Sequence, residues 1–132
     1  MLHHISFGIS DMERAAAFYD AALAPLGYVR VWEDLVAGDP DQAIGCGIAD
    51  VGDKLAIKLR PDGQRPPGPG FNLALASPSR QAVDDFHRAA LENGGRDNGE
   101  PGLRAGYGPN DYAAVVIDPD DHPIEAVFNA PV

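Results

Sequence analysis

The sequence predicts an α+β fold made of two tandem βαβββ modules, and three observations support this prediction. The second half repeats the first at a spacing of 68 residues, so that segment 18–27 matches segment 86–95 in its Phe, Ala-Ala-Leu and Gly positions. A strand-like pattern precedes each of these helical segments, and shorter strand-like patterns follow it. Modules of about 60 residues bury little surface alone, so the two must share one hydrophobic core.

The first module is expected at residues 1–60. Residues 4–9 alternate between apolar and small or polar side chains, which is typical of a strand with one face against a helix. Ser10 and Glu13 have the spacing of a capping box, which predicts a helix that starts there and ends near Ala24. Gly, Asp and Pro turns then separate three short expected strands, at residues 28–32, 43–49 and 54–59.

The second module is expected at residues 71–132 and follows a linker at 61–70, whose four prolines disfavour both a helix and a central strand. The module opens with a predicted strand at 71–76. A helix follows, with Ser77 as its N-cap and Pro78 at its first position, and ends at residues 93–95. The remaining predicted elements are a strand near Arg96, strands at 112–117 and 123–128, and a turn at 118–121.

Composition excludes several classes of partner. A formal net charge of −10 and a sequence pI of about 4.5 would repel nucleic acid and anionic membrane surfaces. The single cysteine, Cys46, cannot form an internal disulfide and is expected to be an inert buried thiol. The chain has no signal-like N-terminus and no run of about 20 apolar residues, so we expect a cytoplasmic protein. We expect no organic cofactor.

Several motifs together resemble those of the vicinal oxygen chelate superfamily. They are His4 on the first strand, the helical Phe-Tyr-Asp at 18–20, the Tyr-Ala-Ala at 112–114, and the Asp-Pro-Asp turn at 118–120 that precedes Glu125. This superfamily includes glyoxalase, extradiol dioxygenases, fosfomycin-resistance enzymes and bleomycin-binding proteins, and the resemblance covers essentially the whole chain. It implies that the strands form a curved, cup-shaped mixed sheet of the glyoxalase/dioxygenase-like type.

The resemblance also implies a divalent metal (Zn, Mn, Ni or Fe) inside the cup. Its ligand positions fall on His4, Lys58, Asn72 and Glu125, of which only His4 and Glu125 are normal metal ligands. A protonated lysine has no lone pair, and an amide oxygen is a weak ligand. Because a metal usually needs about three protein donors, we expect a partly degenerate site that binds metal weakly.

Residue roles at this site follow from the resemblance, with an ordinary structural role as the alternative for each. His4 and Glu125 are the expected metal ligands, and Glu125 is the candidate catalytic group that moves a proton beside a substrate carbonyl. The expected substrate-binding residues are Lys58, Asn72, Tyr107 and Trp32. Lys58, if it faces the cup, is expected to pair with Glu125 in place of the metal charge.

The other histidines are expected to lie outside the site. His3 is adjacent to His4 and should point to the opposite face of the strand, as an exposed or helix-side residue. His87 falls on a helix and His122 in a turn, and ordinary surface roles are expected for both.

Two functions from different classes are compatible with these residues. The first is a glyoxalase/dioxygenase-family protein that binds a small organic molecule in its cup and acts as a metal-dependent lyase, isomerase or dioxygenase. The second is a non-catalytic small-molecule (drug) binding protein of the bleomycin-resistance type. The exposed sheet edges of such modules favour a homodimer in either case.

Overall fold

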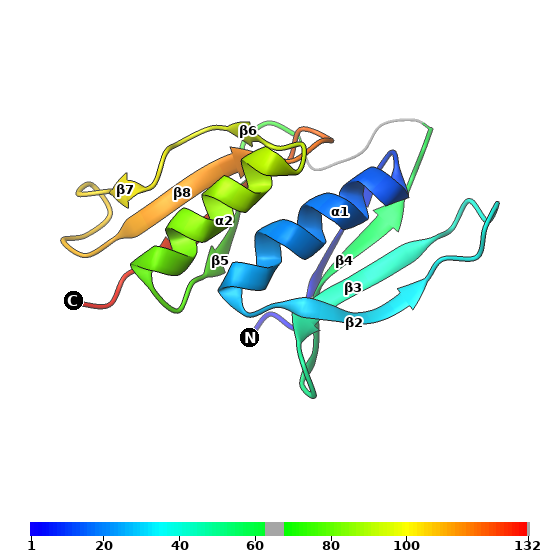
Figure 1. Cartoon of the computed structure of the whole chain (residues 1–132), viewed down its shortest axis with the longest axis horizontal. Helices are drawn as coiled ribbons and strands as arrows, with labels where there is room; N and C mark the ends of the chain where they lie inside the picture. The colour runs from blue at the N-terminus through cyan, green and yellow to red at the C-terminus, as the bar shows by residue number, and fades with distance from the viewer. Residues whose placement is uncertain (63–67, 132) are drawn as a thin grey trace.

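The computed structural model describes residues 1–62 and 68–131 and shows two modules that open in the same order (Figure 1). The first module consists of β1 (Ile5–Ile9), α1 (Met12–Leu23), the short 3-10 helix η1 (Ala24–Leu26), β2 (Val29–Asp34), β3 (Ala43–Ile48) and β4 (Gly52–Leu59). The second consists of β5 (Leu73–Ala76), α2 (Arg80–Glu92), β6 (Arg96–Asp97), β7 (Gly102–Leu103), β8 (Tyr112–Ile117) and β9 (Pro123–Phe128). Residues 63–67 of the expected linker lie outside the described residues.

The 68-residue repeat of the sequence is also the repeat of the structure. β1 and β5 begin at residues 5 and 73, and α1 and α2 begin at residues 12 and 80, so both pairs differ by 68. Each module has its own mixed sheet, with the strand order β1-β4-β3-β2 in the first and β5-β9-β8-β6 in the second. β6 and β7 both pair with β8 and together replace the longer β2 of the first module. The predicted α+β class is confirmed.

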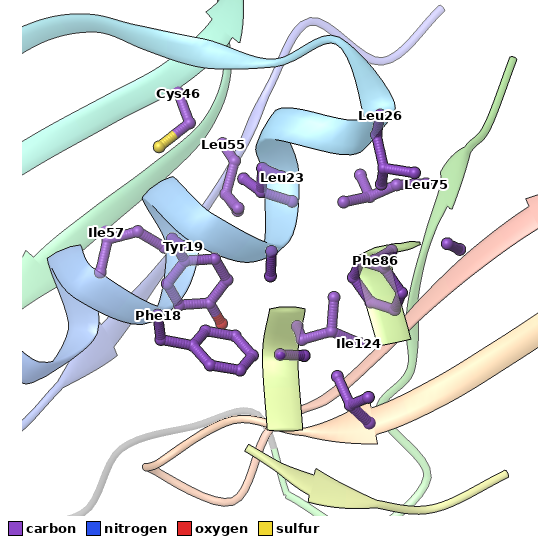
Figure 2. Close-up of a cluster of buried hydrophobic side chains, with 14 of the residues drawn as sticks. Phe18, Tyr19, Leu23, Leu26, Cys46, Leu55, Ile57, Leu75, Phe86 and Ile124 are labelled. Carbon is purple, nitrogen blue, oxygen red and sulfur yellow. The ribbon is translucent and has the colours of Figure 1, made fainter. Parts of the chain in front are cut away.

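The core lies between the two helices and the sheets. Both helices cover the same face of the sheets and pack beside each other (Figure 1). Phe18 and Phe86, which the repeat matches, are both fully buried. Figure 2 shows that side chains of both modules meet in one cluster, among them Leu55, Leu75 and Ile124. Burying such a side chain stabilises the folded state by about 1.5–3 kcal/mol. Because the cluster contains side chains of both modules, either module alone would lose part of this stabilisation.

Both helix caps differ from those that the sequence predicts. The N-cap of α1 is Asp11, whose carboxylate accepts a hydrogen bond from the Arg14 amide at 3.0 Å. Ser10 is not the cap, because its hydroxyl donates to Asp120 at 2.6 Å in the other module. The N-cap of α2 is Ser79 and not Ser77. In both cases a neighbouring side chain meets the capping geometry while the predicted serine bonds elsewhere.

The turn between β8 and β9 ties the second module to the first. The Tyr19 hydroxyl of α1 donates to Asp118 Oδ2 at 2.5 Å, and His122 Nδ1 lies 2.8 Å from the same oxygen. The His122 ring also packs on Phe7 of β1, with 4.4 Å between ring centroids. The surface role expected for His122 is wrong, since this residue is only 3% exposed. Burial, followed by the charge of Asp118, raises the pKa of Tyr19 well above its usual value.

His87 and Cys46 have local structural environments. His87 Nε2 lies 2.9 Å from Asp97 on β6, and this contact, followed by the Gly99 amide, lowers the pKa of Asp97. Cys46 on β3 is buried, and its burial raises the thiol pKa to about 11. A thiol with this pKa is almost wholly protonated at neutral pH, which fits the inert role expected for Cys46.

Neither α1 nor α2, nor any other helix within residues 1–62 and 68–131, is long and apolar enough to cross a bilayer.

Candidate functional site on the helix-free face

The face of the first sheet that carries no helix is lined with small residues. Leu55 and Ile57 on β4 point toward α1 and are fully buried, so the alternating residues Ala56 and Lys58 point the other way. Strand register places Ser6 and Gly45 beside Ala56 on this face. Because these side chains are small, they leave space for a larger neighbouring side chain, and Ala56 is only 3% exposed.

Trp32 on β2 covers part of that space. It pairs with Gly45 across the two strands, and a Cβ atom at Gly45 would overlap the Trp32 indole. The ring is 40% exposed, and its Nε1–H donates to Asp53 Oδ2 at 3.3 Å. Glycine at position 45 therefore lets the indole lie directly against the sheet, while part of the residue stays exposed.

The second sheet contributes a polar pair. Ile124 and Ala126 on β9 are fully buried beneath α2, so Glu125 between them points to the helix-free face. Asn72 precedes β5 by one residue, and its side-chain amide donates to Glu125 Oε1 at 2.7 Å. The carboxylate thus has a neutral hydrogen-bond donor as its partner.

The remaining expected site residues do not join this pair. Lys58 is half-buried beside Gly8 of β1, and no ion pair links it to Glu125 within the described residues. Tyr107 is 82% exposed on the loop between β7 and β8. His4 is exposed one residue before β1, in the place that Asn72 holds in the second module.

His3 is exposed as expected, but the opposite-face orientation expected for it is wrong. His3 Nδ1 lies 2.8 Å from His4 Nδ1, so the two imidazoles converge and do not point to opposite faces. The physical reason is that both residues precede β1, which begins at Ile5, and the alternation of a strand does not apply to them.

Sequence reasoning missed Arg104 and Asp53. The Arg104 guanidinium lies near the strand that carries Val115. Both residues are close to Gly99, where an added Cβ atom would be 3.3 Å from Arg104 Nη2 and 3.6 Å from Val115 Cβ. Val115 is the register partner of Glu125. Arg104 donates to the Glu100 and Gly102 carbonyls, and no periodic pattern in the Gly-rich stretch predicts this position. Asp53 was missed because a β-bulge determines the face on which it lies.

A divalent metal does not fit the four positions that the sequence resemblance points to. The Asn72 N–H donates to Glu125 Oε1, which leaves the second carboxylate oxygen of Glu125 as its available donor to a metal. The ammonium of Lys58 is a cation without a lone pair. The set provides two strong donors, His4 and Glu125, which is below the three or four that metal sites in proteins use.

Tandem βαβββ modules with a shared core and an open helix-free face define the fold class of glyoxalase-like proteins. The chain belongs to the Glyoxalase/Bleomycin resistance protein/Dioxygenase superfamily, whose family model matches residues 1–126.

Solved structures support this membership. A glyoxalase/bleomycin resistance protein from Albidiferax ferrireducens T118 is 30% identical with a TM-score of 0.71, and the match covers 94% of each chain. A glyoxalase-related enzyme from Fulvimarina pelagi shares the fold at 23% identity and a TM-score of 0.71, over 98% of this chain and 88% of that chain. Glyoxalase I from Zea mays shares it at 21% identity and a TM-score of 0.72, over 96% of this chain and 45% of that one. No curated protein matches the sequence.

Proposed function

We propose that this protein binds a small organic molecule on the helix-free face without a metal at the family's ligand positions, as a binding protein of the bleomycin-resistance type. One observation carries the proposal: the Glu125 carboxylate accepts a hydrogen bond from the Asn72 amide at 2.7 Å, while another of the family's ligand positions holds the cation Lys58. This arrangement gives a Lewis acid only two strong donors, His4 and Glu125, but it offers hydrogen-bonding groups to an organic ligand.

The surface chemistry indicates the class of ligand. The open face of Trp32 can stack on a planar ring, and such contacts add about 0.5–1.5 kcal/mol beyond the buried area. Glu125 can accept a hydrogen bond from an N–H or O–H group of the ligand through its second oxygen. The net charge of −10 favours association with a cationic molecule. We therefore expect a planar aromatic ligand that carries a cationic or N–H-bearing group.

The catalytic alternative is a metal-dependent lyase, isomerase or dioxygenase in which His4 and Glu125 hold Zn, Mn, Ni or Fe. In that case Glu125 would be a ligand and a proton carrier, and a third donor would have to come from water or the Asn72 oxygen. With Asn72 as that donor, its side chain would have to turn its oxygen toward the metal and lose its hydrogen bond to Glu125.

Calorimetric titration in the presence of EDTA tests the proposal. The probes are metal-free bleomycin and a panel of planar cationic dyes, with Trp32 fluorescence as a second signal because the chain has one tryptophan. We expect at least one probe to bind saturably without metal, and Glu125→Gln to weaken that probe by about tenfold. Glu100→Gln, the matched control on an exposed loop, should leave the affinity unchanged.

Two results would contradict the proposal. One is that no probe binds with an affinity that depends on Glu125. The other is that protein purified without chelator holds a stoichiometric metal and turns over a glutathione hemithioacetal or a catechol only when that metal is present. The second result would favour the enzyme.

We also propose a homodimer. β2 and β6 each lie at one end of their sheet, with β1 and β5 at the opposite ends, and an unpaired edge favours association. Exposed apolar residues gather where β2 starts and where β3 turns into β4, namely Val29, Ile48 and Val51. Sedimentation should give twice the chain mass of 13.9 kDa, and a monomer at all concentrations would contradict this proposal.

A further inference from the structure

We infer that His3, His4 and Asp53 form a divalent-metal site at the edge of the first sheet, which shares only His4 with the positions implied by the family. One ligand atom from each residue lies within 4.8 Å of the other two. The set provides two imidazole nitrogens and one carboxylate oxygen, a combination that binds borderline ions such as Zn²⁺ and Ni²⁺. Open positions remain for water, because both histidines are exposed.

The distances require little rearrangement. Two nitrogen ligands of a tetrahedral zinc, each at 2.0–2.1 Å, are separated by about 3.3 Å. His3 Nδ1 and His4 Nδ1 are now 2.8 Å apart. Both rings are exposed, and they meet edge to face with centroids 5.0 Å apart. Rotation of either side chain can open this gap without disturbing the core.

A β-bulge aims Asp53 at the two histidines. The register between β3 and β4 pairs Cys46 with Leu55 but Gly47 with Asp53, so Lys54 is the extra residue. Without the bulge, Asp53 would alternate to the helix side of the sheet. Gly47 is needed for this geometry, since a Cβ atom there would overlap the backbone oxygen of Gly52.

Trp32 orients the carboxylate. Its indole N–H donates to Asp53 Oδ2 at 3.3 Å, which leaves Oδ1 available for an ion. Metal-binding carboxylates and histidines commonly have such a second partner, which fixes their orientation. The same contact makes Trp32 a local reporter, because a bound Ni²⁺ ion would lie close to the indole and quench its fluorescence.

Nickel titration of the full chain tests this site, followed by calorimetry and Trp32 fluorescence. We expect one ion per chain, saturable quenching, and a loss of affinity of about tenfold or more in each of His3→Gln, His4→Gln and Asp53→Asn. Nickel should raise the unfolding midpoint of the wild-type chain and not that of Asp53→Asn. The midpoints without nickel should agree, which excludes misfolding as the cause.

Asp50→Asn is the matched control, because it removes the same charge from the turn that directly precedes β4. Asp50 has a φ of 64°, a backbone conformation that asparagine tolerates well, so the control should fold. Nickel affinity should stay within about twofold in Asp50→Asn and in Glu125→Gln.

Four results would overturn the inference. The first is unchanged affinity in Asp53→Asn, and the second is no saturable binding at millimolar nickel. The third is a loss of nickel affinity in His3→Gln but not in His4→Gln or Asp53→Asn, since a terminal amino group with one histidine could then account for the binding. The fourth is an equal loss in Glu125→Gln, which would place the ion at the family's positions. Because the organic-ligand proposal depends on Glu125 and this site on Asp53, the failure of one is distinguishable from the failure of the other.

Discussion

At the residue scale, the environment of Glu125 distinguishes two possible partners for this carboxylate in place of a metal ion, Lys58 and Asn72. The sequence suggests that Lys58 replaces the metal by pairing with Glu125. In the structure the Glu125 carboxylate accepts from Asn72 at 2.7 Å, and no ion pair connects it to Lys58 within the described residues. The expected pair is therefore replaced by an amide–carboxylate hydrogen bond.

Two double-mutant cycles measure this difference. Asn72→Ala and Glu125→Ala should show a coupling of about 0.5–1 kcal/mol in unfolding free energy. Either substitution alone already removes the solvent-accessible hydrogen bond between the two residues, so the double variant does not lose it a second time. Lys58→Ala and Glu125→Ala should be additive within about 0.5 kcal/mol. Urea unfolding at neutral pH provides all the values. A larger coupling for Lys58 than for Asn72 would restore the charge-pair account.

Tyr19→Phe probes the buried contact between the modules. Removing the hydroxyl leaves Asp118 Oδ2 without one of its donors, which should cost about 1–3 kcal/mol of unfolding free energy at pH 7. Tyr107→Phe is the control, because Tyr107 is 82% exposed and should change stability by less than about 0.5 kcal/mol. An equal effect of the two substitutions would show that the buried hydrogen bond contributes nothing.

The same tyrosine predicts an alkaline loss of stability. The pKa of Tyr19 is raised in the folded protein, so the native state keeps the phenol proton that the unfolded chain releases above pH about 10. This contribution is fully present below pH 10 and decreases as the pH rises beyond it. Urea midpoints measured between pH 9 and 11.5 should fall less steeply for Tyr19→Phe than for the wild-type chain. Parallel curves would contradict the prediction.

At the element scale, the bulge between β3 and β4 is the feature that shapes the helix-free face. Two glycines of β3 allow close approach for different reasons. Gly45 faces the movable Trp32 side chain, whereas Gly47 faces the backbone of Gly52 and Asp53. A side chain can rotate away from an added methyl group, but a paired backbone cannot move without breaking its ladder.

This contrast predicts different costs for the same substitution. Gly47→Ala should destabilise by about 2–3 kcal/mol or more, and Gly45→Ala by about 1 kcal/mol with a shift in Trp32 fluorescence as the indole moves. Thermal unfolding and emission spectra of the two variants provide the test. A smaller loss for Gly47→Ala than for Gly45→Ala would mean that the bulge is not rigid.

At the scale of the whole molecule, the modules are joined by both apolar and polar contacts. The buried cluster includes residues of both modules, and the 118–122 turn bonds to α1 and packs on β1. Such sharing makes independent unfolding of one module costly, because the other would lose its buried partners.

We therefore predict one cooperative transition. Trp32 reports on the first module, and far-UV circular dichroism reports on both helices. The two signals should follow the same urea curve. A Trp32 transition that precedes the loss of helix by a resolved interval would show that the modules unfold separately.

Much of the architecture is predictable from the sequence for identifiable reasons. The repeat fixes equivalent starts for β1 and β5 and for α1 and α2, because the same periodic apolar pattern produces the same elements. The helix-free orientation of Glu125 follows from its place between two buried apolar neighbours. The caps were less predictable, since Ser10 and Asp11 can both bond to first-turn amides and only the distant Asp120 decides which one does.

By itself, the sequence determined the class of fold and the two modules, because apolar periodicity is a local property. It also places only two normal metal ligands, His4 and Glu125, at the four positions that the family resemblance implies. Only the tertiary structure decided which groups meet. It paired Asn72 with Glu125, buried His122 against Asp118, and brought Asp53 within 4.8 Å of His3 and His4. These contacts depend on strand register, a β-bulge and the packing of two modules, and residues far apart in a sequence carry no local pattern that specifies them.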